Sequence, residues 1–185
     1  MTTRSAWGLG LATVTDDGNG TAEANPASAI PGETVTLTAT PAENFFFLKW
    51  TVLSGGIELE NPTENPTTFT LPEGGGNIEI RAEFTDLLSL AASEIIAYDA
   101  EKAATVTRLS VGGHLTDEVT AAIFDKFQNL LFLELTDAKA IPDNFMYDAG
   151  SRAPKQTKLE ELNAPEVKSV GVNAFSNSVL TAVNN

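Results

Sequence analysis

The feature that most constrains the fold of this chain is an internal repeat in its second half. Segments of the form L-x-x-L-x-L begin at Val106, Leu130 and Leu159, and a further copy begins at Leu180. Such a segment is typical of a short strand whose apolar side chains point to one side. One copy cannot bury that side alone, so repeats of this kind stack into a continuous core. The pattern therefore predicts a solenoid, with the last repeat incomplete.

A second element recurs between the leucine segments. It runs over Ile141–Phe145 and again over Val170–Phe175, and Val119 with Phe124 occupies the matching place in the first copy. We expect this element to return the chain across the other side of each coil. The polar stretch Asp148–Lys158 interrupts the repeat and is interpreted as an insertion.

The segment before the first leucine repeat predicts a helix. Residues 87–100 lack Gly and Pro, are rich in Ala and Leu, and carry apolar residues at helical spacing. Asp86 is placed to act as the N-cap of that helix. We expect this helix to cap the first coil of the solenoid.

The first half predicts strands and turns without helices. Residues 33–40 alternate apolar and Thr side chains, which is typical of a half-buried strand. Clusters of Gly, Pro, Asn and Asp separate this strand from its neighbours. The other predicted strands cover 7–15, 45–53, 57–60, 67–71 and 77–84. This half is therefore predicted to be a small all-β module, with the boundary between the modules at Thr85-Asp86.

Composition excludes several classes of function. The 185 residues include no Cys, one His, 11 basic and 25 acidic residues, for a net charge of −14. That charge argues against nucleic acid or an anionic membrane surface as partner. Without Cys, thiolate catalysis and Cys/His zinc sites are excluded. Residues 1–86 hold three basic and twelve acidic residues, whereas residues 87–185 hold eight and thirteen.

Residues 7–84 resemble a bacterial extracellular repeat domain. The resemblance is carried by Gly32–Pro41, which reads GE-x-VTLTATP, by an aromatic pair and Trp50, and by Asn65-Pro66-Thr67. The segment Phe69–Pro72 and the final aromatic Phe84 complete the pattern. In that family pattern Phe45, Phe47 and Trp50 belong to the core, which requires a β-bulge before Trp50.

Residues 105–185 are similar to BspA-type leucine-rich repeats of bacterial surface proteins. Their units carry an I-G-x-x-A-F element, which Val170–Phe175 fits well and Ile141–Met146 fits loosely. The two resemblances together imply a secreted or surface-anchored adhesin-like protein, and they imply no catalytic residues. We expect the signal and the anchor to lie outside this chain.

Three groups of residues have a catalytic or metal-binding alternative. Asp16–Gly20 carries oxygen ligands for calcium, but the twelve-residue EF-hand frame is absent, so a hairpin turn is favoured. Glu58 and Glu60 share one strand face and could serve as a glycosidase pair, but a solvated face is favoured. His114 has no nucleophile elbow beside it, so a loop histidine is favoured.

Two regions are candidates for contact with a ligand. Arg152, Lys155 and Lys158 bring basic side chains into the insertion of the second half. In the first half, the run Phe45–Trp50 is interpreted mainly as core, with Phe46 and Leu48 as its exposed members. Residues 7–12 could be a truncated signal peptide but are favoured as the first strand.

Together these observations predict a mostly β protein: a small all-β module, sandwich- or grasp-like, at residues 1–85, then a helix-capped leucine-rich-repeat solenoid at 86–185. We expect a non-catalytic, adhesin-like binding protein without cofactor or metal. The β module would be a spacer and the repeats a recognition surface for a host or bacterial protein or glycan. The alternatives are a carbohydrate-active enzyme and a purely structural stalk.

Overall fold

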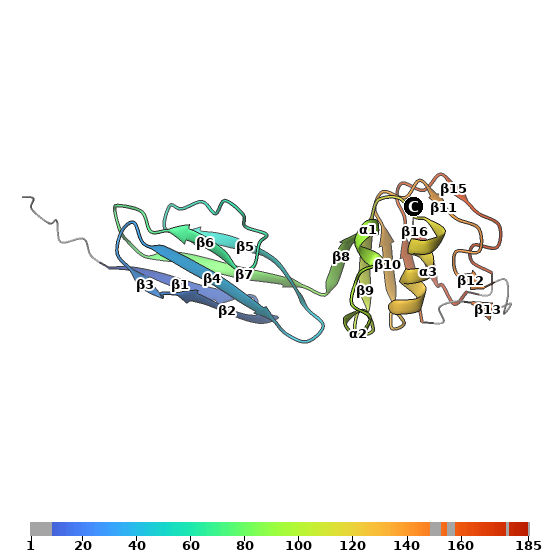
Figure 1. The fold of residues 1–185 in the computed structure, drawn as a ribbon, viewed down its shortest axis with the longest axis horizontal. Coiled ribbons are helices and arrows are strands. Elements are labelled where there is room, and N and C mark those ends of the chain that lie inside the picture. Colours follow the sequence, from blue (N-terminus) through green and yellow to red (C-terminus); the bar gives the residue numbers. More distant parts are fainter. Residues whose placement is uncertain (1–8, 149–152, 155–157, 177, 185) are drawn as a thin grey trace, which may run out of the picture. The chain divides into compact units, whose positions relative to one another are not determined.

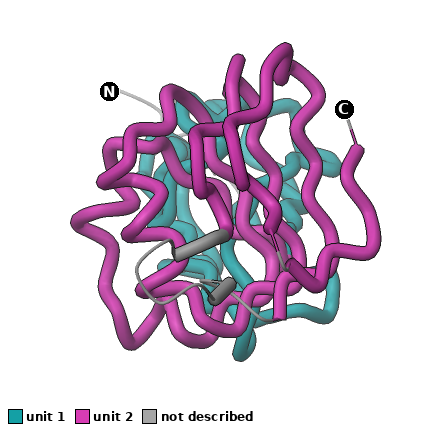
Figure 2. Tube along the Cα trace, turned by 90° about the vertical axis from the view of Figure 1, so that its right-hand side faces the viewer, with its two compact units in different colours: residues 1–85 teal, residues 86–185 magenta. Residues whose placement is uncertain are grey.

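The chain forms two compact units in a computed structural model, residues 1–85 and residues 86–185 (Figure 2). The structure describes residues 9–148, 153–154, 158–176 and 178–184. Each unit is described by itself below. The chain is mostly β, with 41% of residues in strands and 11% in helices, as the sequence predicts.

Unit 1 contains two sheets (Figure 1). The first has the order β3-β1-β7-β5, in which β1 and β7 run parallel and the other pairs are antiparallel. The second has the order β2-β4-β6 and is antiparallel throughout. The strands of unit 1 are β1 (Gly10–Asp16), β2 (Gly20–Asn25), β3 (Ser28–Ala29), β4 (Thr34–Pro41), β5 (Phe46–Ser54), β6 (Thr67–Thr70) and β7 (Ile78–Thr85).

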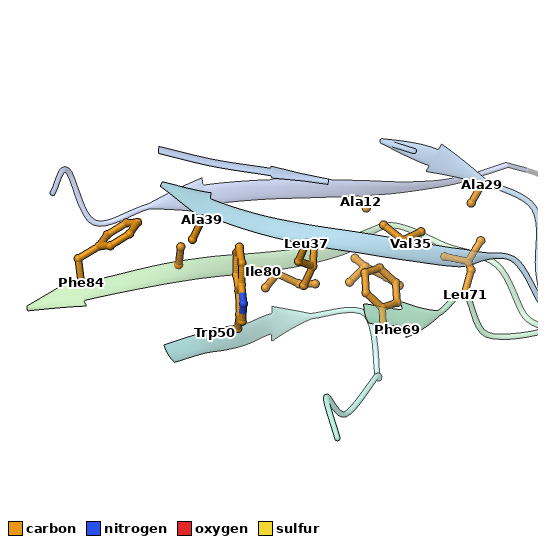
Figure 3. Packing of buried hydrophobic residues seen from close by; sticks show 12 residues of the cluster. Ala12, Ala29, Val35, Leu37, Ala39, Trp50, Phe69, Leu71, Ile80 and Phe84 are labelled. Carbon is orange, nitrogen blue, oxygen red and sulfur yellow. The ribbon is translucent and has the colours of Figure 1, made fainter. Parts of the chain in front are cut away.

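The core of unit 1 lies between these sheets (Figure 3). The alternation of β4 sends Val35, Leu37 and Ala39 inward, each 5% exposed or less. They meet Ile80 of β7 and Trp50 of β5, which is 2% exposed. Burial of this apolar surface is the main force that holds the two sheets together.

A β-bulge in β5 places the aromatic side chains. The register with β7 shifts between Phe47 and Lys49, so Phe47 and Trp50 both face the core although they are three residues apart. The bulge that the family pattern requires before Trp50 is thus present. The indole Nε1 donates to the carbonyl of Glu64 at 3.1 Å, and the Trp50 backbone N donates to Pro62 at 2.7 Å.

Three details of unit 1 differ from the sequence prediction. The strands β2 and β3 form between residues 20 and 29, where no strand is predicted. Ile57–Glu60 does not form a strand: Ile57 and Leu59 pack against the core from a loop, and this alone produces their alternation. Asp16–Gly20 is a turn, but it does not close a hairpin, because β1 and β2 belong to different sheets. Gly18 has the expected positive φ of 94°.

Unit 2 is built on one five-stranded parallel sheet whose strands follow chain order, β8-β9-β10-β14-β16 (Figure 1). Its inward row joins Leu109 to Leu133 and Leu133 to Leu162, all fully buried, and ends at Val183. These are matching positions of the leucine repeat, so the repeat correctly predicts the register. The strands are β8 (Leu87–Ala91), β9 (Arg108–Gly112), β10 (Phe132–Leu135), β14 (Glu161–Asn163) and β16 (Ala182–Asn184).

The predicted helix over residues 87–100 is wrong. Leu87–Ala91 is the first strand, β8, and it pairs in parallel with β9, Leu88 opposite Leu109. Pairing and burial of Leu88, 8% exposed, override the helical propensity of this Ala- and Leu-rich segment. Asp86 is accordingly no N-cap, and the segment up to residue 103 forms only two short helices, α1 (Ala92–Ile95) and α2 (Ala100–Ala103).

The segments between the strands close the other side of unit 2. One is the helix α3 (Asp117–Lys126), capped by the Thr116 side chain on the Val119 N–H. The rings of Phe124, Phe145 and Phe175, the matching members of the second repeated element, form a ladder with centroids 5.1 and 6.3 Å apart. The remaining strands are β11 (Ala140–Ile141) and β15 (Ser169–Val170), which pair in parallel, and β12 (Tyr147–Asp148) and β13 (Ala153–Pro154), which pair antiparallel.

Gly171 explains part of the I-G-x-x-A-F pattern. Its N–H donates to the Ile141 carbonyl at 2.8 Å, and a Cβ at this position would lie 2.4 Å from the Asp143 N. The Asp143 Oδ1 accepts from the Val172 N–H at 2.7 Å. A side chain at 171 would push successive return segments apart, so the motif needs Gly here for close approach.

Candidate functional site

The outer face of the five-stranded sheet in unit 2 is a regular array of side chains, most of them partly or fully exposed and one, Ser110, buried at 6% exposure. Because side chains alternate along a strand, the residues between the inward leucines point away from the core. Phe132 lies opposite Arg108 and Glu161, and Glu134 lies opposite Ser110 and Asn163. Two outward rows therefore cross the sheet. The first comprises Leu87, Arg108, Phe132, Glu161 and Ala182, and the second comprises Ser89, Ser110, Glu134, Asn163 and Asn184.

Glu134 is held at the centre of this outer face. Its Oε2 accepts from the Ser110 hydroxyl at 2.8 Å, and its Oε1 accepts from the Asn163 Nδ2 at 2.8 Å. In the same way Glu161 Oε1 accepts from the Asn184 Nδ2 at 3.0 Å. These donors are neutral, so they fix the orientation of the carboxylates without cancelling their charge.

Arg108 brings the cation of this face into a fixed position. Its guanidinium carbon lies 4.5 Å from the ring centroid of Phe132, a cation–π contact between neighbouring strands. Its Nε lies 3.5 Å from Asp86 Oδ2. The side chain as a whole is 42% exposed, although its Nε atom is buried.

Hollows border the sheet at both ends of its strands. At the carboxyl ends, hollows of about 490 and 500 Å³ lie beside the Gly112-Gly113-His114 loop. At the amino ends, a hollow of about 320 Å³ is lined by Leu131, Lys158, Glu160, Val179 and Thr181.

The predicted ligand residues fall in different places. Lys158 is exposed, lines the smallest of these hollows, and donates to the Asn129 Oδ1. Arg152 and Lys155 lie outside the described residues. Phe46 is half-buried opposite Thr85 in unit 1, and Leu48 is 46% exposed at the bulge of β5. Of the three that the structure describes, Lys158 is the one that lies beside the sheet of unit 2.

The residues considered above as catalytic or metal-binding alternatives have the following environments in the structure. Glu58 and Glu60 are exposed on a loop. Asp16 Oδ1 and Asp17 Oδ1 accept the Gly18 and Asn19 backbone N–H groups, and Asp17 Oδ2 also accepts from Phe84 N. His114 is exposed on its loop. Within the described ranges, no three His, Cys, Asp or Glu side chains cluster as metal ligands would.

The outward residues of the repeats were missed by the sequence prediction. Ser110, Glu134 and Asn163 share one position of the L-x-x-L-x-L pattern, between its second and third apolar residues. Since the repeat fixes the register, that shared position predicts a row across the sheet.

Comparison with known proteins bears on unit 1. Residues 11–87 match the divergent InlB B-repeat domain family, which supports a bacterial extracellular repeat domain. Comparisons with curated proteins and with solved structures gave no significant match. No helix in the described part of the chain has the length and apolar character needed to cross a bilayer.

Proposed function

We propose that this chain is a non-catalytic, adhesin-like binding protein of the bacterial surface or extracellular space. Unit 1 would act as a spacer and unit 2 as the recognition element for a host or bacterial protein or glycan. The bacterial extracellular character is supported by the match of residues 11–87 to the divergent InlB B-repeat domain family. The recognition role is carried by unit 2, outside that match.

We further propose that unit 2 belongs with leucine-rich repeats of the BspA type. The support is the parallel register of the leucine positions, with Leu109, Leu133 and Leu162 in one buried row. The phenylalanine ladder at matching repeat positions, from Phe124 to Phe175, adds a second periodic element. Stacked repeats of this kind present a continuous surface whose side chains can vary without loss of the core.

The observation that carries the binding proposal is the outer sheet face. Phe132, Glu134 and Asn163 are half-exposed there, although strand pairing on both sides holds their backbones in place. A rigid backbone with accessible aromatic, charged and amide groups loses little entropy when it binds a partner. Arg108 and Phe132 together provide the residue types that are enriched at binding hot spots.

The test is capture of ligands by the full chain and by two matched variants. Panels of immobilised glycans and of host and bacterial surface proteins are probed with the wild type, Asn163→Arg and Gln128→Arg. Asn163→Arg adds a bulky cation to the outer face and keeps a donor beside Glu134, whereas Gln128 is exposed just beyond α3. Both variants change the net charge by the same amount.

We expect at least one ligand in the panels to be captured by the wild type and by Gln128→Arg but not by Asn163→Arg. A ligand that Asn163→Arg retains would place recognition elsewhere on the molecule. Failure of the wild type to capture anything from either panel would favour the alternative of a purely structural stalk.

A further inference from the structure

Most of the described basic residues of unit 2 lie away from the outer sheet face. Among its described basic residues, Arg108 is the one on this face, and its Nε already lies beside Asp86. Lys102 and Lys126 lie on helices. The others, Lys139, Lys158 and Lys168, lie in segments between the strands of the sheet.

The two carboxylates of the face are held in position by neutral hydrogen-bond donors. The Glu134 carboxylate accepts hydrogen bonds from a hydroxyl and an amide, and the Glu161 carboxylate accepts one from an amide. Of the described ion pairs, none includes either residue. A cationic group that approaches the sheet therefore meets oriented acceptors, and no described basic side chain forms an ion pair with either of them.

The spacing of the carboxylates matches an extended peptide. Glu161 lies opposite Phe132, two residues before Glu134, so the carboxylates are diagonal neighbours on adjacent strands. With strands ~4.8 Å apart and ~3.3 Å per residue, the diagonal measures roughly 8 Å between backbones. Alternate side chains of an extended peptide are ~7 Å apart and point to one side.

From this arrangement we propose that the outer sheet face binds an extended protein segment with Lys or Arg at alternate positions. Two such side chains pair with Glu134 and Glu161, while Phe132 and Arg108 contact the intervening residues and their carbonyl groups. Cationic side chains at this spacing belong to a protein rather than to a neutral or acidic glycan. The inference rests on the proposed function, since it names the partner of the same face.

The experiment measures binding of labelled model peptides to the full chain by fluorescence anisotropy. The probes are peptides of about twelve residues, one alternating Lys and Ser and the other alternating Glu and Ser, long enough to cross the five strands at ~4.8 Å each. The test variant is Glu134→Gln/Glu161→Gln, which keeps the side-chain shape and an amide oxygen as acceptor. The control is Glu101→Gln/Asp125→Asn, which removes the same charge from exposed positions on α2 and α3.

We expect the Lys-Ser peptide to bind, with affinity falling as salt rises, and the Glu-Ser peptide not to bind. The test variant should weaken binding about tenfold, and the control less than about twofold, because only the former removes positioned partners. The single variant Glu161→Gln, at a residue bonded only to its neighbour Asn184 among the described contacts, should give an intermediate loss with an unchanged fold.

Equal losses in the two double variants would overturn the inference, because they would report attraction to overall negative charge. No binding of the Lys-Ser peptide would overturn it too. Either result leaves the proposed function standing if the panels give a ligand that Asn163→Arg loses. Failure of that panel test, by contrast, would remove the basis of both.

Discussion

At the scale of single residues, Asn65 replaces a strand partner in unit 1. The antiparallel register of β4 and β6 ends where Leu37 faces Thr67, and Asn65 occupies the next matching place, opposite Ala39. There the side chain forms both ladder bonds: Oδ1 accepts from Ala39 N at 2.9 Å, and Nδ2 donates to Ala39 O at 2.7 Å. The Asn-Pro-Thr motif of the family pattern thus has a direct structural reason.

Replacing Asn65 with Ala should leave the two polar groups of the Ala39 backbone without protein partners. Ala39 is 5% exposed, so we expect a loss of about 1–3 kcal/mol in the stability of unit 1. This loss of stability is measured by urea unfolding followed by tryptophan fluorescence. The matched control is Asn61→Ala in the other Asn-Pro pair of the loop, where the side chain is exposed and a change below about 0.5 kcal/mol is expected. Equal effects at the two positions would contradict the assigned role.

Glu83 makes the stability of unit 1 depend on pH. The Thr51 hydroxyl donates to Oε1 at 2.7 Å and the Arg81 Nη2 donates to it at 3.0 Å, which lowers the pKa of Glu83 below its ordinary value of 4.5. Lys49 Nζ, 3.6 Å from Oε2, acts in the same direction. A carboxyl group with a depressed pKa in the folded state stabilises that state fully above 4.5 and loses its contribution as pH falls through the depressed value.

We therefore expect Glu83→Gln to lower the urea midpoint of unit 1 at pH 7 and to leave it nearly unchanged at the acid end of the range. Tryptophan fluorescence at a series of pH values from 7 downward measures the difference. Glu79→Gln, on an exposed side chain of the same strand, serves as control. A difference between wild type and Glu83→Gln that stays constant with pH would show that packing, not charge, is responsible.

At the scale of elements, β8 shows where local sequence and tertiary structure compete. Leu87–Ala91 has the composition of a helix, yet Leu88 continues the inward row of the sheet, and Ser89 faces outward opposite Ser110. Leu88→Ala should cost about 2–5 kcal/mol in unit 2 because it removes a buried leucine. Ser89→Ala should change stability by less than about 0.5 kcal/mol. Thermal unfolding followed by circular dichroism measures both, and a tolerated Leu88→Ala would argue against β8 as a core strand.

The periodic parts of the fold were predictable from sequence. The segments in which local helix propensity competes with strand pairing were not. Leu109, Leu133 and Leu162 recur at matching positions, so pattern alone predicts their burial and register. In β8 the same pattern is present, with Leu88 and Leu90 in the matching places, but the helical composition of residues 87–100 concealed it. The face with Glu134 was missed because its residues are typical of any solvated strand, and only the register brings them together.

At the scale of the whole molecule, the division at Thr85 predicts separate unfolding of the two units. Both tryptophans, Trp7 and Trp50, lie in residues 1–85. The described helices α1, α2 and α3 all lie in unit 2. Selective tryptophan fluorescence therefore follows unit 1, and helical circular dichroism mainly follows unit 2.

We expect the two signals to give different midpoints in one denaturant titration, because each unit has its own hydrophobic core. Asn65→Ala should shift only the tryptophan transition, and Leu88→Ala only the helical one, since each substitution weakens one core. Calorimetry of the wild type should give a measured enthalpy larger than the van't Hoff value. A single transition, with matching enthalpies and with both signals shifted by either substitution, would show that the units fold as one cooperative body. The β module would then stabilise the repeats directly, a role that a passive spacer does not have.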